Sequence, residues 1–531
     1  MARSVWKVSL LGVAATIASL AGRPALAQAD TPAEPGRLVI QAEQPGPVIN
    51  RDIFGQFAEH LGTGIYGGVW VGDSSKIPNV RGIRSDVVAA LKAIKVPVVR
   101  WPGGCFADEY HWRDGVGPAN RRKTTVNSVW AGAVEPNTFG THEFMDFVAR
   151  LGAEPMLGVN MGTGDIALAS AYIEYVNAPA GTYWADQRVA NGRKEPWGVK
   201  WWCLGNEMDG PWQIGHLDAV EYGKKALEAA KMMRWNDDTV KLVLAGSSSV
   251  GMATYPMWDR TILELCYDHV DVLSMHYYAG NRNDDTPSYL ALTREFETYV
   301  DSLASTINYV KAVKRSKKQV KLSWDEWNVW YKNMEMDGKW SVAPHLIEEV
   351  YNLEDAVLVG AWLNVFLRKC DVLEAACLAQ MVNVIGPLLT TKDGMLKQSI
   401  YYPFQMVASR AKGDSLDVWV DSPLYSSKKE ADVPMLDVSA SWDAETETGG
   451  IYIVNRNLKK PITVTITVND GLKPMIATGG ETLWGTDPKA FNTFNAPNAV
   501  VSAPLTNIKS QKGKITVTVP PLSTSAIDVR V

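Results

Sequence analysis

The sequence predicts a (β/α)8 barrel followed by a C-terminal antiparallel β-sandwich of the jelly-roll kind. Two observations lead to this fold class. Between residues 50 and 395, short apolar and β-branched runs alternate with amphipathic helical stretches, which is the pattern of βα units around a parallel sheet. From about residue 396 the helical periodicity disappears, and β-branched residues alternate with polar ones as they do in antiparallel strands.

The first region contains eight strand-like runs, the number that closes a barrel of this kind. They lie at 54–59, 96–101, 155–159, 199–204, 240–245, 270–276, 320–325 and 377–384. Helical stretches lie between them at 85–94, 141–151, 218–233, 290–313 and 353–370. The competing fold is a doubly wound open sheet. It would need fewer strands and a glycine-rich phosphate loop, which this sequence lacks.

The second region has strand-like runs at 416–420, 450–454, 462–468, 514–519 and 524–529. A further run at 37–41 falls outside the barrel count and could pair with this sandwich. A chain of 531 residues is too long for one ordinary core. We therefore expect an N-terminal segment at 28–49, the barrel at 50–395 and the β-sandwich at 396–531.

The first 27 residues have the pattern of a secretory signal peptide. Arg3 and Lys7 give a basic start, residues 8–21 are apolar, and residues 25–27 read Ala-Leu-Ala, which suits a signal peptidase. No later segment is long and apolar enough to span a membrane. The pattern predicts export to the periplasm or the medium, with a retained N-terminal anchor as the alternative.

Composition narrows the possible partners. The net charge of −5 argues against nucleic acid or an anionic membrane as a partner. The five cysteines have no CxxC spacing and the seven histidines no HExxH motif, so we expect no metal and no cofactor. The 20 tryptophans favour a carbohydrate ligand, because their flat apolar faces stack on sugar rings, although large barrels also bury many aromatic side chains.

Two glutamates lie where predicted barrel strands end. Glu207 follows the apolar run in KWWCLGNEMDG (200–210), and Glu326 ends the run in KLSWDEW (321–327). Because active sites of such barrels lie at the carboxyl ends of the strands, we expect the two carboxylates to meet there. A carboxylate pair is what hydrolysis of a glycosidic bond requires. The alternative is that both glutamates form structural ion pairs with arginines at the barrel top.

Several further motifs resemble one known family. WCLGNE and WDEWN are similar to the barrel glycosidases of clan A. FGQFAEHLGTGIYGGVW (54–70), RWPGGCFADEYHW (100–112), MHYY (275–278), HLIEEVYNLEDAV (345–357) and LAQMVNVIGP (378–387) resemble the α-L-arabinofuranosidases of glycoside hydrolase family 51. The motifs occur in order along the whole barrel. The C-terminal sandwich agrees with the family in position only.

The resemblance implies a retaining double displacement. In it, Glu207 corresponds to the acid/base, and Glu326 to the nucleophile that forms a covalent arabinosyl-enzyme. Arg100, at the end of the second strand, is the neighbour expected to keep Glu326 ionised.

The resemblance also implies a set of sugar-binding residues. These are Glu59, Cys105, Asn206, Tyr278 and Gln380. Asn206 is expected to donate to the sugar 2-hydroxyl. Cys105 stands where related enzymes also use asparagine, and a thiol is a poorer donor than an amide. Trp130 and Trp330 could wall the pocket or belong to the core.

The activity implied is an exo-acting α-L-arabinofuranosidase that removes terminal non-reducing arabinofuranosyl residues from arabinan, arabinoxylan or their oligosaccharides. Two alternatives remain at this stage. One is an endo-β-glucanase of the same clan, and the other is a catalytically inactive carbohydrate-binding protein. The second is disfavoured because both glutamates are present in their full motifs. Assembly into a homo-oligomer is compatible with the sequence.

Overall fold

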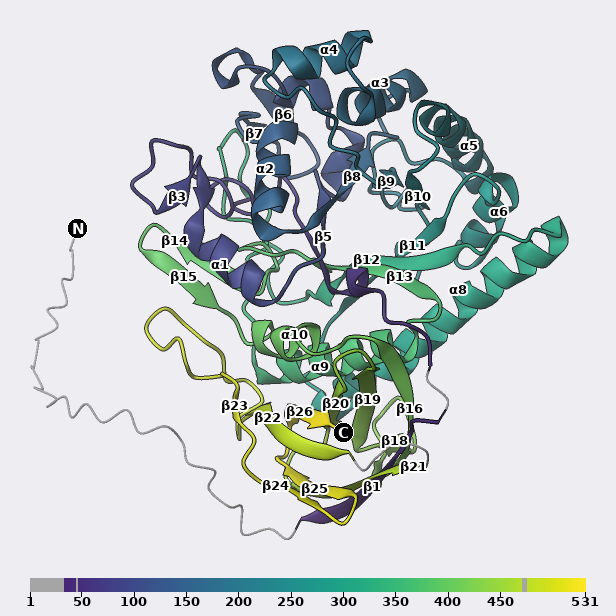
Figure 1. Ribbon diagram of the computed structural model, residues 1–531. Coiled ribbons are helices and arrows are strands. Elements are labelled where there is room, and N and C mark those ends of the chain that lie inside the picture. The colour runs from purple at the N-terminus through teal and green to yellow at the C-terminus, as the bar shows by residue number, and fades with distance from the viewer. Residues whose placement is uncertain (1–32, 44–45, 470–474) are drawn as a thin grey trace, which may run out of the picture.

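The computed structural model describes residues 33–43, 46–469 and 475–531, and it contains a barrel and a β-rich C-terminal domain (Figure 1). The barrel and its surrounding helices form the upper part of Figure 1, and the β-rich domain forms the lower part. Helices α9 (Leu353–Arg368) and α10 (Tyr401–Ala408) lie between the two. The region predicted as a signal peptide, 1–27, lies outside the described residues.

All eight predicted barrel strands are present, and they close into one parallel barrel. In cyclic order they are β2 (Gly55–Phe57), β5 (Val98–Trp101), β8 (Glu154–Val159), β9 (Trp201–Leu204), β10 (Lys241–Leu244), β11 (Val272–Ala279), β12 (Lys321–Val329) and β13 (Leu373–Ala379). Strand β13 lies earlier than the predicted 377–384. Residues 373–376 read Leu-Glu-Ala-Ala, which favours helix, but pairing with β12 overrides that preference.

Helices pack around the outside of the barrel and at its ends (Figure 1). They are α1 (Ser85–Ala93), α2 (Thr141–Leu151), α3 (Ile166–Asn177), α4 (Tyr183–Ala190), α5 (Ala219–Asn236), α6 (Met257–Cys266), α7 (Thr286–Leu290) and α8 (Thr293–Lys314), together with α9 and α10. The five predicted helical stretches correspond to α1, α2, α5, α8 and α9. Helix α3 was not predicted, because apolar residues occupy most of its positions and leave no clear amphipathic period.

The C-terminal domain is built on a ten-stranded sheet in the order β23-β22-β26-β20-β19-β16-β1-β21-β25-β24. Its strands are β1 (Glu34–Gln41), β16 (Asp414–Asp421), β19 (Leu436–Asp443), β20 (Thr448–Asn455), β21 (Ile462–Asn469), β22 (Ile476–Trp484), β23 (Ala503–Pro504), β24 (Ile508–Gln511), β25 (Lys514–Val519) and β26 (Ser523–Arg530). Short two-stranded sheets complete the list: β3 (Asn79–Val80) with β4 (Ile83–Arg84), β6 (Thr125–Asn127) with β7 (Ala133–Glu135), β14 (Leu388–Thr391) with β15 (Gly394–Lys397), and β17 (Leu424–Tyr425) with β18 (Val433–Pro434).

Strand β16 lets this sheet fold back on itself. Its first residues, 414–416, pair with β19, whereas residues 417–421 pair with β1. The two halves enclose one apolar core of residues such as Leu38, Ile451 and Val517. Pairs in the sheet are antiparallel except β1 with β21, which is parallel. The N-terminal strand thus joins the C-terminal sheet, while the domain boundaries at 50 and 395 stay a prediction.

Charged contacts connect the two parts. Asp437 on β19 is buried and accepts from Arg368 at the end of α9 at 2.9 Å and from Arg456 at 2.6 Å. Burial alone would raise the pKa of Asp437, but the two guanidinium groups hold it below its usual value.

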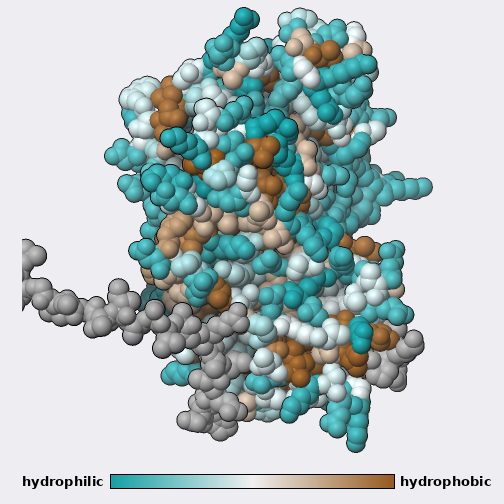
Figure 2. Space-filling view, turned by 60° about the vertical axis from the view of Figure 1, so that its left-hand side comes forward, coloured by the Kyte–Doolittle hydropathy of each residue, from teal (hydrophilic) through white to brown (hydrophobic). Residues whose placement is uncertain are grey.

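The face drawn in Figure 2 is mostly hydrophilic, with small separate hydrophobic patches. Among the described residues, no helix is both long and apolar enough to cross a membrane.

Candidate active site

The seven residues predicted to form the site converge at the carboxyl ends of the barrel strands. Two predicted positions, Asn206 and Glu207, lie on the turn that begins with Gly205 after β9, and Glu59, Cys105 and Gln380 follow β2, β5 and β13. The other two, Tyr278 and Glu326, lie within the last residues of β11 and β12. Hydrogen bonds connect members of the set, so the structure brings together residues that are up to 321 positions apart in sequence.

Glu326 lies inside its strand, and the prediction that the strand ends at 325 is wrong. Strand β12 continues to Val329. In the pairing with β11, Ser323 lies opposite Ser274, and Glu326 lies opposite His276. The interval is three residues along β12 and two along β11, so β12 carries one extra residue. Such a bulge re-aims side chains. Asp325 and Glu326 are neighbours that would otherwise face opposite sides of the strand, yet both contact Arg100.

The carboxylate of Glu326 is held by donors on both oxygens. Arg100 donates to Oε1 at 2.6 Å, and the Tyr278 hydroxyl donates to Oε2 at 2.9 Å. The Glu326 side chain is only 6% exposed, so these donors replace water in stabilising its charge. Space for the carboxylate depends on Gly104, because a Cβ there would overlap Glu326 Oε1.

Glu207 has a different set of partners. His276 Nδ1 lies 2.9 Å from its Oε1, and the Trp212 indole donates to its Oε2 at 2.7 Å. Burial alone would lower the pKa of His276, but the charge of Glu326 and hydrogen bonds to Asp325 and Glu207 raise it to about 10. At neutral pH His276 is therefore a cation that donates to Glu207.

Sequence reasoning missed Trp212, and it assigned His276 no contact with either glutamate. Trp212 lies five residues after Glu207, within the same conspicuous GNEMDGPW run, so its position was a usable signal. The contact between His276 and Glu207 joins two different strands, and no spacing in the sequence encodes it.

Glu59 and Gln380 form a buried pair beside Glu326. The backbone amides of Gly104 and Phe106 donate to Glu59 Oε1 at 3.0 Å, and Gln380 Nε2 donates to Oε2 at 3.3 Å. Burial, together with the negative charge of Glu326, raises the pKa of Glu59 to about 7.

Asn206 and Cys105 lie between the two glutamates. Asn206 Oδ1 accepts from Arg100 at 2.7 Å, which turns its Nδ2 toward the Cys105 sulfur at 4.0 Å. The Cys105 thiol is 3.9 Å from Glu207 Oε2. Burial and the surrounding carboxylates raise the pKa of Cys105 well above its usual value, so it is a neutral thiol.

A cation could be considered at this site, because Glu207, His276 and Glu326 present ligand atoms within 4.8 Å of one another. The donor set does not fit well. A protonated imidazole has no lone pair for a metal, and Arg100 already supplies a positive charge to Glu326. The site is built around two cationic side chains.

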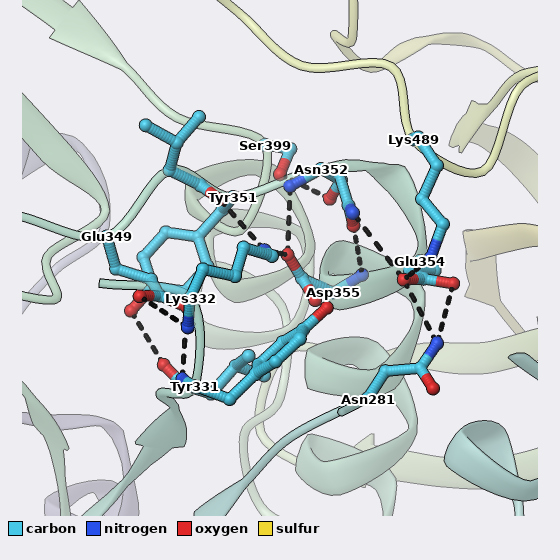
Figure 3. A network of polar contacts seen from close by, with 12 residues as sticks. Asn281, Tyr331, Lys332, Glu349, Tyr351, Asn352, Glu354, Asp355, Ser399 and Lys489 are labelled. Carbon is cyan, nitrogen blue, oxygen red and sulfur yellow. Dashed lines mark hydrogen bonds and ion pairs between the residues drawn. The ribbon is translucent and has the colours of Figure 1, made fainter. Parts of the chain in front are cut away.

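A network of three acidic residues supports the loops that follow β11 and β12 (Figure 3). Glu349 accepts from the backbone amides of residues 331–333. Glu354, at the start of α9, accepts from Asn281 after β11 at 3.2 Å and from Lys489 of the C-terminal domain at 2.6 Å. Asp355 accepts from Lys332 at 2.5 Å. The network thus ties both loops and the C-terminal domain to α9.

Replacing Lys332 with methionine should destabilise the fold by about 2 kcal/mol, because Asp355 is fully buried and would lose its cation. The expected loss of stability is kept this small because the Lys332 side chain is itself 28% exposed, and solvent screens its attraction to Asp355. Burial already raises the pKa of Asp355, and Lys332 opposes that shift. Its loss should therefore cost more at pH 8 than at pH 5, where protonation removes part of the uncompensated charge.

Denaturant unfolding of both proteins at the two pH values measures this difference. Lys392→Met is the matched control, since the Lys392 side chain is 82% exposed and, among the described residues, pairs only with its exposed neighbour Asp393. An equal, pH-independent loss in the two variants would contradict the assigned role of Lys332.

Comparison with known proteins gives a consistent result. The family model described as the α-L-arabinofuranosidase 1 domain matches residues 90–304, and the model described as the α-L-arabinofuranosidase C-terminal domain matches residues 325–523. The chain is 42% identical over 424 residues to the intracellular exo-α-(1→5)-L-arabinofuranosidase 1 of Bacillus subtilis, covering 79% of this chain and 84% of that enzyme.

Two further proteins extend the comparison. An intracellular exo-α-(1→5)-L-arabinofuranosidase of Halalkalibacterium halodurans is 44% identical over 413 residues, covering 77% of this chain and 82% of that enzyme. The solved structure of a family 51 α-L-arabinofuranosidase from Bifidobacterium longum superposes with a TM-score of 0.89 at 33% identity, covering 94% of this chain and all of the other.

These relatives contradict the prediction of export. The enzymes of Bacillus subtilis and Halalkalibacterium halodurans are intracellular by name. The interpretation of residues 1–27 as a signal peptide, and of the protein as secreted to the periplasm or medium, is therefore wrong on this comparison. The pattern behind the prediction was short. A basic start, an apolar stretch and three small residues carry little information beyond composition.

Proposed function

Because the chain belongs to the α-L-arabinofuranosidases of glycoside hydrolase family 51, and acts as an exo-enzyme on non-reducing ends, we propose that it cleaves by retaining double displacement with Glu326 as nucleophile and Glu207 as acid/base. The observation that carries the proposal is the spacing of the two carboxylates. Their nearest ligand oxygens lie within 4.8 Å of each other. Retaining glycosidases separate the two carboxyl groups by about 5–5.5 Å, whereas inverting ones leave about 6.5–9.5 Å for a water molecule.

In the first step Glu326 attacks the anomeric carbon. Arg100 and Tyr278 keep its charge in place and its oxygens oriented, so little reorganisation is needed as the bond forms. The glycosidic bond breaks as the new ester bond forms, and the sugar is held as a covalent arabinosyl-enzyme.

Glu207 gives its proton to the leaving oxygen and later takes a proton from the incoming water. The site around it contains two cationic side chains, Arg100 and His276, which pair with Asp325, Glu326 and Glu207. Arg100 holds the pKa of Asp325 below its usual value against the effect of burial, and Arg100 also pairs with Glu326.

The remaining predicted residues suit the hydroxyl groups of one furanose. Asn206 Nδ2 is free of strong protein acceptors near the cleavage point, where a bond to the 2-hydroxyl strengthens in the transition state. Glu59, paired with Gln380, offers an acceptor on the other side of Glu326. Cys105 fits this set as a small apolar wall, since a neutral thiol is a weak donor.

We propose arabinan, arabinoxylan and their oligosaccharides as substrates, from which single terminal residues are removed. The alternative of an endo-β-glucanase is disfavoured because the relatives are named exo-arabinofuranosidases. An inactive binding protein is disfavoured because both glutamates keep complete sets of partners. Homo-oligomer formation stays a prediction.

The stereochemical course tests the mechanism directly. With nitrophenyl α-L-arabinofuranoside in aqueous methanol, proton NMR should detect methyl α-L-arabinofuranoside as the first glycoside, because two inversions restore the configuration. Incubation without enzyme is the control for spontaneous methanolysis. Formation of the β-configured methyl glycoside would instead mean a single inversion, and the assigned roles would fail.

A further inference from the structure

A pocket outside the catalytic cluster lies between the β-rich domain and the barrel, where β1 and β16 face α8 and α9. It encloses about 370 Å³, which is within the usual range for small-ligand sites. It is lined mainly by side chains of β16 and of the end of α9, among them Gln41, Glu297, Arg368, Lys369, Asp417 and Trp419. None of these residues belongs to the catalytic cluster.

Trp419 is the aromatic side chain of this pocket. It belongs to the outward-facing set of β16 with Asp417 and Asp421, while Val418 and Val420 point toward the sandwich core. Half of its surface, 50%, is exposed, although indole is a large and mostly apolar group. The Arg37 guanidinium lies 5.6 Å from the ring centroid and supports the indole from the neighbouring strand. Core packing does not account for a tryptophan in this position.

The pocket also offers the Gln41 amide and the Asp417 carboxylate, planar groups that can hydrogen-bond two sugar hydroxyls at once. Arg368 forms the wall of the pocket, because its guanidinium donates to Glu297, to Asp437 and to the backbone carbonyl of Val438. Asp417 is exposed. The lining carries two acids, Glu297 and Asp417, and two bases, Arg368 and Lys369, so it favours an uncharged ligand.

The pocket lies toward the end of the barrel opposite the catalytic carboxylates. The backbone carbonyl of Lys369 accepts a hydrogen bond from the amide of Leu373, the first residue of β13, whereas Glu207 and Glu326 lie where the strands end. One sugar chain could occupy the pocket while another part of the same polymer, or a neighbouring one, reaches the catalytic site.

We propose that this pocket is a second carbohydrate-binding site, in which Trp419 stacks on a neutral pentose residue of the polysaccharide and Asp417 and Gln41 contact its hydroxyls. The proposal rests on the proposed function only in taking that polysaccharide as the ligand. A second attachment point raises the local concentration of polymer near the enzyme without changing the chemistry.

Affinity electrophoresis in gels that contain soluble arabinan or arabinoxylan tests the site. The Glu326→Ala protein is used as the parent, so that the polymer is not degraded. Adding Trp419→Ala should weaken retardation by about tenfold, the scale expected when an aromatic anchor is truncated. Asp417→Ala should weaken it as well. Trp235→Ala is the matched control, because Trp235 is a 75% exposed tryptophan on α5 of the barrel, and it should leave retardation unchanged.

Unchanged retardation after Trp419→Ala, or a parent that neither polymer retards, would overturn the proposal. A lower molecular mass of the Trp419→Ala protein than of its parent in size-exclusion chromatography would also overturn it, because the surface would then be covered by a second copy of the chain. Trp419→Ala in the wild-type enzyme should leave kcat/KM on nitrophenyl arabinofuranoside unchanged. That assay reports on the proposed function independently, since wild-type enzyme inactive on the small substrate would reject the function and not this site.

Discussion

Replacing Glu326 with alanine is expected to abolish turnover, by about 10⁵-fold or more, the scale of loss when a covalent nucleophile is removed. Without the carboxylate no glycosyl-enzyme can form. Arg100 keeps Asp325 and Asn206 as partners, so the variant should still fold. Azide added to the variant should occupy the vacated space and attack the anomeric carbon once, giving an arabinofuranosyl azide of inverted configuration.

Initial rates and NMR of the azide product measure this outcome. Glu335→Ala is a suitable control, because Glu335 is an exposed acid on the loop after β12 and should be dispensable for turnover. Hydrolysis by the Glu326→Ala variant at a rate similar to wild type would remove Glu326 from the mechanism.

Replacing Glu207 with alanine should produce a loss that depends on the leaving group. A sugar alkoxide needs a proton to depart, whereas nitrophenolate departs largely unaided. Loss of the acid should therefore slow glycosylation by about 10²–10⁴-fold on arabino-oligosaccharides and far less on nitrophenyl arabinofuranoside. Deglycosylation should be slow on both substrates because the same residue is the base, so nitrophenol should appear as a burst.

Stopped-flow absorbance at substrate saturation measures the burst, and the melting temperature of the variant controls for a folding defect. The side chain of Glu207 is 11% exposed, and its partners are His276 and Trp212. Its replacement therefore removes contacts at the active site and none in the apolar core. Equal losses on the two substrates without a burst would mean that Glu207 is not the acid/base.

Much of the barrel could be predicted from the sequence because its strands are buried on both faces. Runs such as 201–204 and 241–244 are apolar at nearly every position, and the residues that end the runs stand out. Strands of the C-terminal domain were less readable. Strand β19 buries Ser439 and Ser441 among its apolar residues, so its burial does not follow from side-chain polarity, and it was not predicted.

By itself, the sequence determined the eight-stranded barrel, the two glutamates and the family, because these depend on patterns among residues close together in the sequence: apolar runs of strand length and short motifs. The tertiary structure alone decided how those residues act. The bulge that turns Asp325 and Glu326 toward Arg100, the contact of His276 with Glu207, and the exposure of Trp419 beside α9 all arise from pairing between distant segments. Closing the barrel and folding back the sheet creates these contacts, and no spacing along the chain records them.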